Sequence, residues 1–369
     1  MLRITGRMMP DAGLSIPNNF YICAMIPVLN SKFIIDGVPR ELTPAGLLAP
    51  VLEKLPEAES PGGVFMDETM DPAPGAIVTG GADIFSLLGA LDGGQRRIPV
   101  PFAAPCTRGR IAETLIDTLW RKGNIRLDDL HLTVKWTCNP AKVGDMAAFY
   151  DSVESAADYL DTLGTLLRRC SCEEGDFGVR FATPFSGAPL LVPDTFADDP
   201  QSWIVYVPFE TSDYRLGGSL LAQTLGQHGG TAPQVDDPDY FMDCFEVVRE
   251  LAEDGVLLSA STVGAGGLLK AMDGMTREGV GASADISGII RSSGENDPVR
   301  ILFSELPAAI IQVRDPDFDY IDAEFLLQDV AFFPLGHPVR GGGLQLATSA
   351  RSGIQDILES LMQNAEGED

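Results

Sequence analysis

The stretch Arg215-Leu-Gly-Gly-Ser219, within YRLGGSLLAQTLG (214–226), decides the fold predicted for this sequence. It follows WIVYVPF (203–209), an apolar run typical of a buried strand, and it leads into an apolar run that predicts a helix. Glycine has no Cβ, so paired glycines let a backbone come close to a ligand, and a helix start offers unpaired N–H groups. The pattern predicts an anion-binding loop, and the alternative is a tight turn between a strand and a helix.

The same pattern recurs further along the chain. VLLSASTVGAGGLLKAM (256–272) again joins a strand-like run to a helical run through paired glycines, Gly266 and Gly267. Ile301-Leu-Phe-Ser-Glu305 then leads into the strand-like run AAIIQV. Each motif alone is explained as well by a tight turn, but three in this order point to one particular fold.

The order RLGGSLLAQ, GGLLKAM and LFSELPAAIIQV resembles the C-terminal part of the phosphoribosylformylglycinamidine synthase family. These enzymes, also called formylglycinamide ribonucleotide amidotransferases, are ATP-dependent ligases of purine synthesis. The resemblance covers about residues 105–337, and SKFIIDGVPRELT (31–43) looks like the segment that introduces the family's second repeat. It implies an α+β, two-domain fold like aminoimidazole ribonucleotide synthetase (PurM-like), with an N-terminal half-barrel sheet domain and a C-terminal mixed-sheet domain.

The composition of the segments predicts where these domains begin and end. Pro- and Gly-rich residues 1–75 are expected to form a linker or docking segment, with strands in FYICAMI and KFIID and a helix near 44–54. The Pro/Asp/Gly-rich stretch 186–201 is the candidate boundary between the two synthetase-like domains. The predicted divisions are 1–75, 76–195 for the N-terminal domain, 196–363 for the C-terminal domain, and 364–369 for a disordered acidic tail. The C-terminal domain is expected to finish with strands in AAIIQVR and EFLLQDVAFFPLGHP and a helix in SGIQDILESLMQ.

Charge and composition exclude several classes of partner. The 369 residues include 26 basic and 53 acidic side chains, a formal net charge of −27, which repels the phosphodiester backbone of nucleic acids. The apolar run FYICAMIPVL (20–29) is too short to cross a bilayer and lacks the features of a signal peptide. Six scattered cysteines favour a reducing compartment, so we expect a cytoplasmic protein with no nucleic-acid or membrane partner.

Two acidic residues on one predicted helix are candidate metal ligands. In TRGRIAETLIDTLWRKG (107–123), Glu113 and Asp117 are four residues apart, hence on one helix face, where their oxygens could share Mg²⁺. The alternative is a solvated acidic face. The resemblance implies a metal role, because Glu113 matches a magnesium-ligating Glu of the family and Asp117 stands where the family has an Asn. Glu305 likewise matches a family Glu, its alternative being a surface carboxylate at a strand end.

The sequence departs from the family pattern at two motifs. Where the family has a Gly-Lys-Asp-Ser or Gly-Asn-Val-Ser loop at the nucleotide site, this chain has LLRRCSCEEGDFG (166–178). Where the family has His-Asp-x-Ser-Asp-Gly-Gly-Leu, only Gly266-Gly267-Leu268 remain, and the lost carboxylates remove charge that would hold Mg²⁺. These departures leave three functional hypotheses open.

The first hypothesis is that the chain is part or a subunit of this ligase, binding ATP or ADP with Mg²⁺. Its predicted nucleotide site comprises Arg215, Gly217, Gly218, Ser219, Gly266 and Gly267, and its predicted metal ligands are Glu113, Asp117 and Glu305. The second is a non-catalytic pseudo-repeat, or scaffold, that supports a catalytic synthetase partner. The third is a kinase or dikinase of the same fold with another phosphate acceptor. The sequence does not decide whether the chain is itself an enzyme or which residues would be catalytic. The resemblance implies that the chain forms a homo-oligomer or binds a partner repeat.

Overall fold

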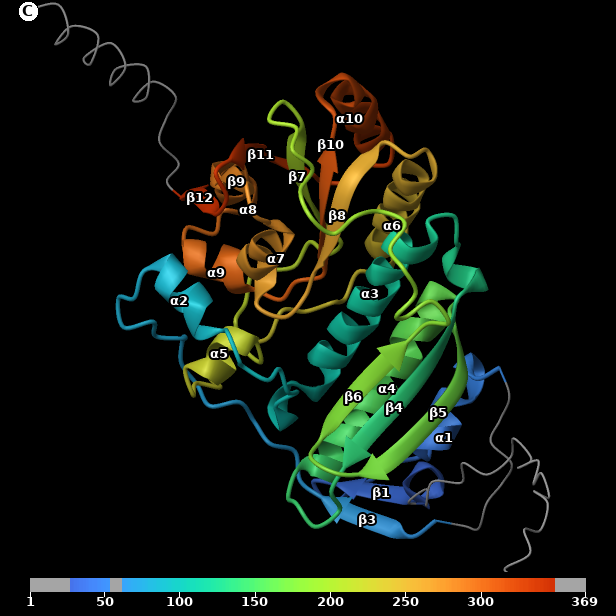
Figure 1. The fold of residues 1–369 in the computed structure, drawn as a ribbon. Helices are drawn as coiled ribbons and strands as arrows, with labels where there is room; N and C mark the ends of the chain where they lie inside the picture. Colours follow the sequence, from blue (N-terminus) through green and yellow to red (C-terminus); the bar gives the residue numbers. More distant parts are fainter. Residues whose placement is uncertain (1–26, 54–61, 349–369) are drawn as a thin grey trace, which may run out of the picture.

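Two main sheets organise the molecule, one of three strands and one of six, each in its own lobe (Figure 1). The computed structural model describes residues 27–53 and 62–348. The predicted strand FYICAMI, the predicted helix at 352–363 and the predicted tail at 364–369 lie outside the described residues.

The first lobe is built on a three-stranded sheet of order β5-β4-β6, comprising β4 (His131–Cys138), β5 (Leu166–Glu174) and β6 (Gly178–Ala182). Strand β4 alternates: Leu132, Val134 and Trp136 are buried while Thr133 and Lys135 are exposed. Helices α3 (Ala103–Lys122) and α4 (Asp145–Leu163) pack against each other and against this sheet. One sheet face is therefore apolar and covered, and the other is polar.

The segment before this lobe is docked on α4. It contains a small sheet of order β2-β1-β3 and the short helix α1 (Pro44–Leu48). The strands are β1 (Lys32–Ile35), β2 (Val38–Pro39) and β3 (Val64–Asp67). The buried ring of Phe33 lies 6.1 Å from that of Phe149 and 5.3 Å from that of Tyr150. Within the predicted segment 1–75, KFIID contains a strand as expected.

The second lobe holds a six-stranded sheet of order β12-β9-β11-β7-β10-β8. Its strands are β7 (Trp203–Pro208), β8 (Leu257–Val263), β9 (Val280–Asp285), β10 (Ala308–Val313), β11 (Phe333–Arg340) and β12 (Leu344–Ala347). Every residue of β10 is buried, as expected for an apolar strand covered on both faces. The helices of this lobe are α5 (Leu220–Thr224), α6 (Pro238–Glu253), α7 (Gly267–Met275), α8 (Ser287–Ser293), α9 (Pro298–Phe303) and α10 (Phe318–Leu327).

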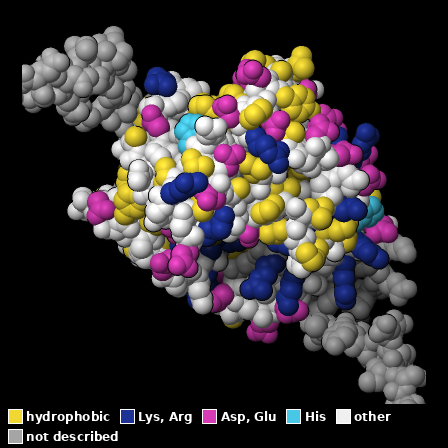
Figure 2. Space-filling view, turned by 45° about the horizontal axis from the view of Figure 1, so that its top comes forward, with side chains coloured by type: hydrophobic (Ala, Val, Ile, Leu, Met, Phe, Trp, Pro, Cys, Tyr) yellow, Lys and Arg dark blue, Asp and Glu magenta, His cyan; other side chains and the backbone are white. Residues whose placement is uncertain are grey.

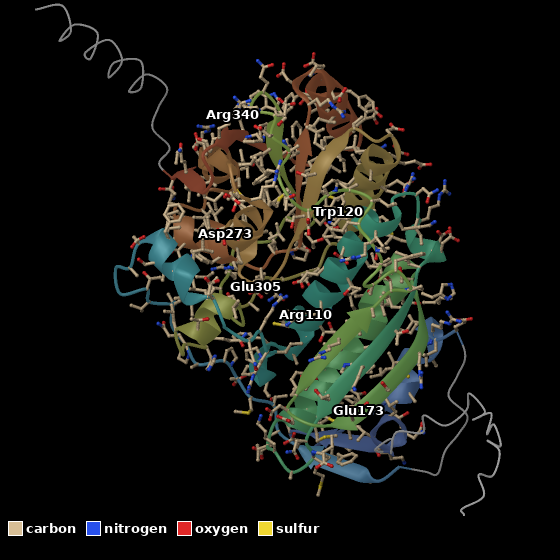
Figure 3. The ribbon with its side chains drawn as sticks, in the orientation of Figure 1. Arg110, Trp120, Glu173, Asp273, Glu305 and Arg340 are labelled. Carbon is tan, nitrogen blue, oxygen red and sulfur yellow. The ribbon has the colours of Figure 1, made fainter. Side chains whose placement is uncertain are left out.

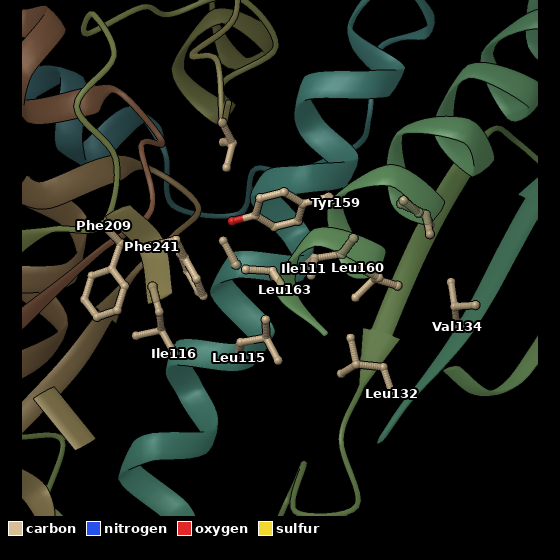
Figure 4. Packing of buried hydrophobic residues seen from close by; sticks show 14 of the residues in the cluster. Ile111, Leu115, Ile116, Leu132, Val134, Tyr159, Leu160, Leu163, Phe209 and Phe241 are labelled. Atoms are coloured by element: carbon tan, nitrogen blue, oxygen red, sulfur yellow. The ribbon is translucent and has the colours of Figure 1, made fainter. Parts of the chain in front are cut away.

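Helix α3 belongs to the cores of both lobes. Figure 4 shows Ile111, Leu115 and Ile116 of α3 between side chains of β4 and α4 and the rings of Phe209 and Phe241. The Trp120 indole, near the end of α3, also donates to Thr262 Oγ1 at 2.9 Å in the second lobe. Helix α2 (Ile84–Ala90), placed by the sequence in the N-terminal domain, packs Leu87 and Leu88 into the second lobe.

One secondary-structure prediction was wrong in part. EFLLQDVAFFPLGHP (324–338) was expected to be extended, but its first residues end helix α10, and only its last residues form β11. The reason is that Ile321 and Phe325, four residues apart, both face the core, whereas Leu326 and Leu327 are exposed. Among the described residues, the structure contains no helix long and apolar enough to span a membrane.

Candidate functional site

The two glycine motifs converge on one carboxylate, that of Glu305. The backbone N–H of Leu220, the first residue of α5, donates to Glu305 Oε1 at 2.7 Å. The N–H of Gly266, at the start of α7, donates to the same oxygen at 2.9 Å. The Glu305 side chain is only 7% exposed. The backbone N–H groups of the glycine motifs, predicted to bind the anion of a ligand, therefore bind the carboxylate of Glu305 instead.

Packing requires glycine in these two motifs. A Cβ on Gly217 would lie 2.5 Å from the Thr231 carbonyl carbon. A Cβ on Gly267, which has φ +72°, would lie 2.6 Å from the Leu302 carbonyl oxygen. Ser219 is the N-cap of α5, its Oγ accepting from the N–H of Ala222 at 3.2 Å. Gly218 and Ser219 line a small cavity beside Glu305, so this loop does lie at the site.

A half-buried arginine, Arg96, joins two of the three carboxylates predicted as metal ligands. Arg96 Nε donates to Glu305 Oε2 at 2.7 Å. Its two terminal nitrogens donate to the two oxygens of Glu113, at 2.7 and 2.6 Å. The side chains of Arg96 and Glu113 are 12% and 15% exposed. Burial acts to lower the pKa of the Arg96 guanidinium, but Glu113 and Glu305 outweigh it, so the pKa is raised and the charge is fixed.

The residues present do not fit the predicted Mg²⁺ site. A guanidinium donates hydrogen bonds but has no acceptor atom, and here its charge already neutralises the oxygens that a cation would need. Asp117 does not join Glu113 and Glu305, because its carboxylate is paired with Arg121 Nε at 2.7 Å. Among the described residues, no cluster of three His, Cys, Asp or Glu side chains is placed to hold a metal ion.

Arg215, also predicted for the nucleotide site, lies elsewhere. Its guanidinium pairs with Asp213, and the side chain is 40% exposed. It lines a different cavity, of about 280 Å³, together with Arg300 of α9. The structure thus brings Glu113, Glu305, Gly218, Ser219 and Gly266 together. Asp117 lines an open cavity with Glu113 but pairs with Arg121, and Arg215 lies in another cavity.

Sequence reasoning did not find Arg96, the residue at the centre of the site. It lies in GGQRRIPVP (93–101), an irregular segment whose only signal is a pair of adjacent arginines in an acidic chain. Cys106 lines the same small cavity, but burial raises the pKa of its thiol to about 12, so it is not an activated nucleophile.

Comparisons with known proteins agree with this fold. Residues 205–321 match the family model described as "AIR synthase related protein, C-terminal domain". Human phosphoribosylformylglycinamidine synthase is 27% identical over 153 residues, which is 41% of this chain and 11% of the human enzyme. A structure of T. maritima PurL complexed with FGAR superposes with a TM-score of 0.51 at 15% identity, covering 70% of this chain and 43% of that one. A second PurL structure, complexed with ATP, gives a TM-score of 0.47 at 14% identity, covering 67% and 39%.

The chain therefore spans less than half of each of these relatives. The resemblance predicted from the sequence is confirmed, as is the two-domain α+β fold. Residues 205–321 thus match the AIR synthase related C-terminal domain, and the chain has a PurM-like fold and is similar to phosphoribosylformylglycinamidine synthase.

Proposed function

We propose that this chain acts in purine biosynthesis as a non-catalytic, synthetase-like repeat that supports a catalytic synthetase partner. The observation that carries the proposal is the arrangement Glu113–Arg96–Glu305, in which a guanidinium lies where the family resemblance implies a metal. The role in purine biosynthesis rests on the similarity to phosphoribosylformylglycinamidine synthase.

The energetics of the cluster favour a closed, structural site. Glu305 is buried, Glu113 is half-buried, and both are hydrogen-bonded, Glu113 by two guanidinium nitrogens and Glu305 by a third and by two backbone N–H groups. A Mg²⁺–nucleotide complex that used these carboxylates would have to displace Arg96 from both Glu113 and Glu305. Breaking a buried pair in this way costs several kcal/mol, about 3–5 in measured cases.

The sequence departures support the same proposal. Residues 166–178, where the family has its nucleotide loop, form β5, a tight connection and the start of β6. The polar face of this sheet carries Lys135, Ser171 and Arg180, and it is the face that we expect a partner repeat to cover. A supporting repeat needs this polar sheet face as its contact surface and a rigid junction between its two lobes. It does not need a bound metal.

The second candidate is the ligase-type repeat that binds ATP or ADP with Mg²⁺. What favours it is that the fold brings Glu113 and Glu305 to one point, as a metal site requires. In this alternative Glu113 and Glu305 would be the residues to hold the metal, and Arg96 would have to leave both of them.

An equilibrium titration distinguishes the two candidates. The purified chain is titrated with ATP and with ADP, each with Mg²⁺ and again with EDTA, alongside a Glu113→Gln/Glu305→Gln variant. The scaffold proposal expects no Mg²⁺-dependent affinity in either protein, and stable association with a synthetase partner in sedimentation. Tight Mg²⁺-dependent binding that the double variant loses, or ligase turnover by the chain alone, would overturn it. Asp117→Asn is the matched control, since its carboxylate pairs with Arg121 outside the cluster.

A further inference from the structure

Two cysteine side chains meet inside the first lobe, away from the Arg96 cluster. Cys138 is the last residue of β4, and Cys172 lies near the end of the neighbouring parallel strand β5. Their Sγ atoms are 3.4 Å apart, and both side chains are almost completely buried. Strand pairing thus brings together two thiols that are 34 residues apart in the sequence.

The register of the two strands fixes this contact. Cys172 pairs with Trp136, and Cys138 lies two residues further along β4, so these side chains share the sheet face that α3 and α4 cover. A disulfide bond requires the two sulfur atoms to approach to about 2.05 Å. Because the sulfurs are already in contact, the bond can form without changing the pairing of the strands.

The two thiols differ in acidity. The S–H of Cys172 donates to the sulfur of Cys138 and lowers the pKa of the Cys138 thiol, against the opposing effects of burial and of the Asp145 carboxylate. The same hydrogen bond and burial raise the pKa of the Cys172 thiol. The thiolate is the reactive form of cysteine. Cys138 is therefore the thiol expected to react first, and Cys172 lies in position to react with the product.

An exposed connection follows Cys138 directly. Residues 140–143, between β4 and α4, are all exposed, and Val143 is 69% exposed. Figure 3 shows Glu173, the residue after Cys172, in the part of the first lobe that lies away from the second lobe. Local opening of a loop costs less free energy than unfolding a whole domain, and it admits small molecules to buried groups.

Size and charge indicate which class of oxidant suits this pair. The net charge of −27 disfavours an anionic oxidant such as glutathione disulfide. The charge is also unevenly spread, and Figure 2 shows Lys and Arg side chains gathered across the lower part of the face in view. A small neutral peroxide is insensitive to both effects, and it needs only a small opening to reach the sulfurs.

We propose that Cys138 and Cys172 form a redox-sensitive site, in which a peroxide converts the two thiols reversibly into a disulfide bond between β4 and β5. The Cys138 thiolate attacks one oxygen of hydrogen peroxide and the O–O bond breaks. The departing hydroxide takes up the proton that Cys138 lost, which leaves a sulfenic acid and water.

The sulfur of Cys172 then attacks the sulfenic sulfur of Cys138. The S–O bond breaks, and the proton of Cys172 leaves with the hydroxyl group as a second water molecule. The two thiols together lose two electrons, and the peroxide gains them. A dithiol reductant reverses the reaction by thiol–disulfide exchange.

The site goes beyond the proposed scaffold role, because the thiols lie on the covered face of the sheet and the partner is expected on the polar face. The disulfide would close a loop that contains α4. A cross-link that constrains the unfolded chain stabilises the folded protein, so we expect the oxidised form to unfold at a higher urea concentration than the reduced form.

Peptide mapping of the full chain by mass spectrometry tests the proposal. The reduced protein is treated with hydrogen peroxide, its remaining thiols are blocked with iodoacetamide, and it is digested with trypsin without reduction. Cys138 and Cys172 fall in different tryptic peptides, 136–142 and 170–180. We expect these peptides to be joined, with a loss of two free thiols per chain, and we expect a dithiol to restore both thiols.

Variants identify the thiols that react. Cys138→Ala and Cys172→Ala should each abolish the link and the shift in urea unfolding. Peptide 170–180 also contains Cys170, a half-buried thiol, and Cys170→Ala should keep the link. Cys244→Ala removes a buried thiol from α6 in the second lobe and is the matched control, which should also keep the link.

Three results would overturn the proposal. The first is a native protein that keeps both thiols in peroxide and forms the link only in urea, which would make the pair ordinary core residues. The second is a link that Cys172→Ala retains and Cys170→Ala loses. The third is a link between two chains, seen as a dimer on a non-reducing gel. The first result is measured on the unmodified protein, so it decides even if a cysteine variant does not fold.

Discussion

Arg96 determines what the residues around it can do. Glu113 and Glu305 were predicted as metal ligands from their family positions, and the fold does bring them to one point. Without a guanidinium between them, two neighbouring carboxylates would attract a metal cation. Paired with Arg96, the same two carboxylates instead link segments of the folded chain. The chemistry of the site therefore depends on Arg96, a residue that belongs to none of the sequence motifs.

Removing Arg96 should strongly destabilise the protein. Arg96→Gln leaves the buried Glu305 and the half-buried Glu113 without their cation, and we expect the free energy of unfolding to fall by about 3 kcal/mol in urea denaturation. Arg97→Gln is the matched control: that side chain is 66% exposed, so its loss should change stability by no more than about 0.5 kcal/mol.

A combined variant separates lost charge pairing from lost packing. Arg96→Met with Glu113→Gln and Glu305→Gln removes all three charges, and we expect it to recover most of the stability lost in Arg96→Gln. If Arg96→Gln is as stable as Arg97→Gln, the cluster is not a structural link, and the proposed scaffold role loses its main support.

Asp151 of α4 should make stability depend on pH. Burial raises the pKa of this carboxyl to about 6, above its ordinary value of 3.8, although Arg40 acts against the shift. A carboxyl whose pKa is raised in the folded state favours folding at low pH, and that contribution is lost as pH rises through about 6. We therefore expect Asp151→Asn to be no more stable than the parent at about pH 4 and more stable at about pH 8, as measured by thermal unfolding.

Asp158→Asn, at an exposed position of the same helix, is the control for that comparison. A stability difference between Asp151→Asn and the parent that stays constant over this pH range would contradict the assignment.

At the scale of elements, the sequence predicted well wherever one residue type marks a boundary. Gly123 and Gly164, for example, are the C-caps of α3 and α4. The paired glycines that were predicted to lead into helices do lie at the starts of α5 and α7. The prediction failed in EFLL, since a short apolar run fits a strand as well as a helix, and only packing of Ile321 and Phe325 decides between them.

Two glycines of α7 should respond in opposite directions to alanine. Gly267, at the first position, has φ +72° and no room for a Cβ against Leu302, so Gly267→Ala should cost at least about 2 kcal/mol. Gly274, near the end of the helix, has open space where a Cβ would lie, with no neighbouring atom within 4 Å, so Gly274→Ala should stabilise by about 0.5–1 kcal/mol. Urea denaturation measures both, and equal effects would show that Gly267 is not required by packing.

At the scale of the whole molecule, the candidate site could be predicted only in part. Family positions identified Glu113 and Glu305, but nothing in the spacing of the sequence connects either of them to Arg96 in an irregular segment before α3. Asp117 was chosen because it shares a helix face with Glu113, and it was left out because Arg121, one turn further on, holds it. Contacts between distant segments depend on the folded structure, which local patterns do not determine.

The two lobes should unfold as one unit. A continuous apolar cluster includes Leu115 of α3, Phe209 and Phe241, and the Arg96–Glu305 and Trp120–Thr262 contacts join the lobes at either end of α3. Separating them would expose this core and break a buried ion pair, so a folded half is unstable alone. We expect far-UV circular dichroism and tryptophan fluorescence to give one coincident urea transition, although Trp136 and Trp203 report on different lobes. Two separate transitions would mean that the domains predicted on either side of residues 186–201 are independent, and that the Arg96 cluster does not couple them.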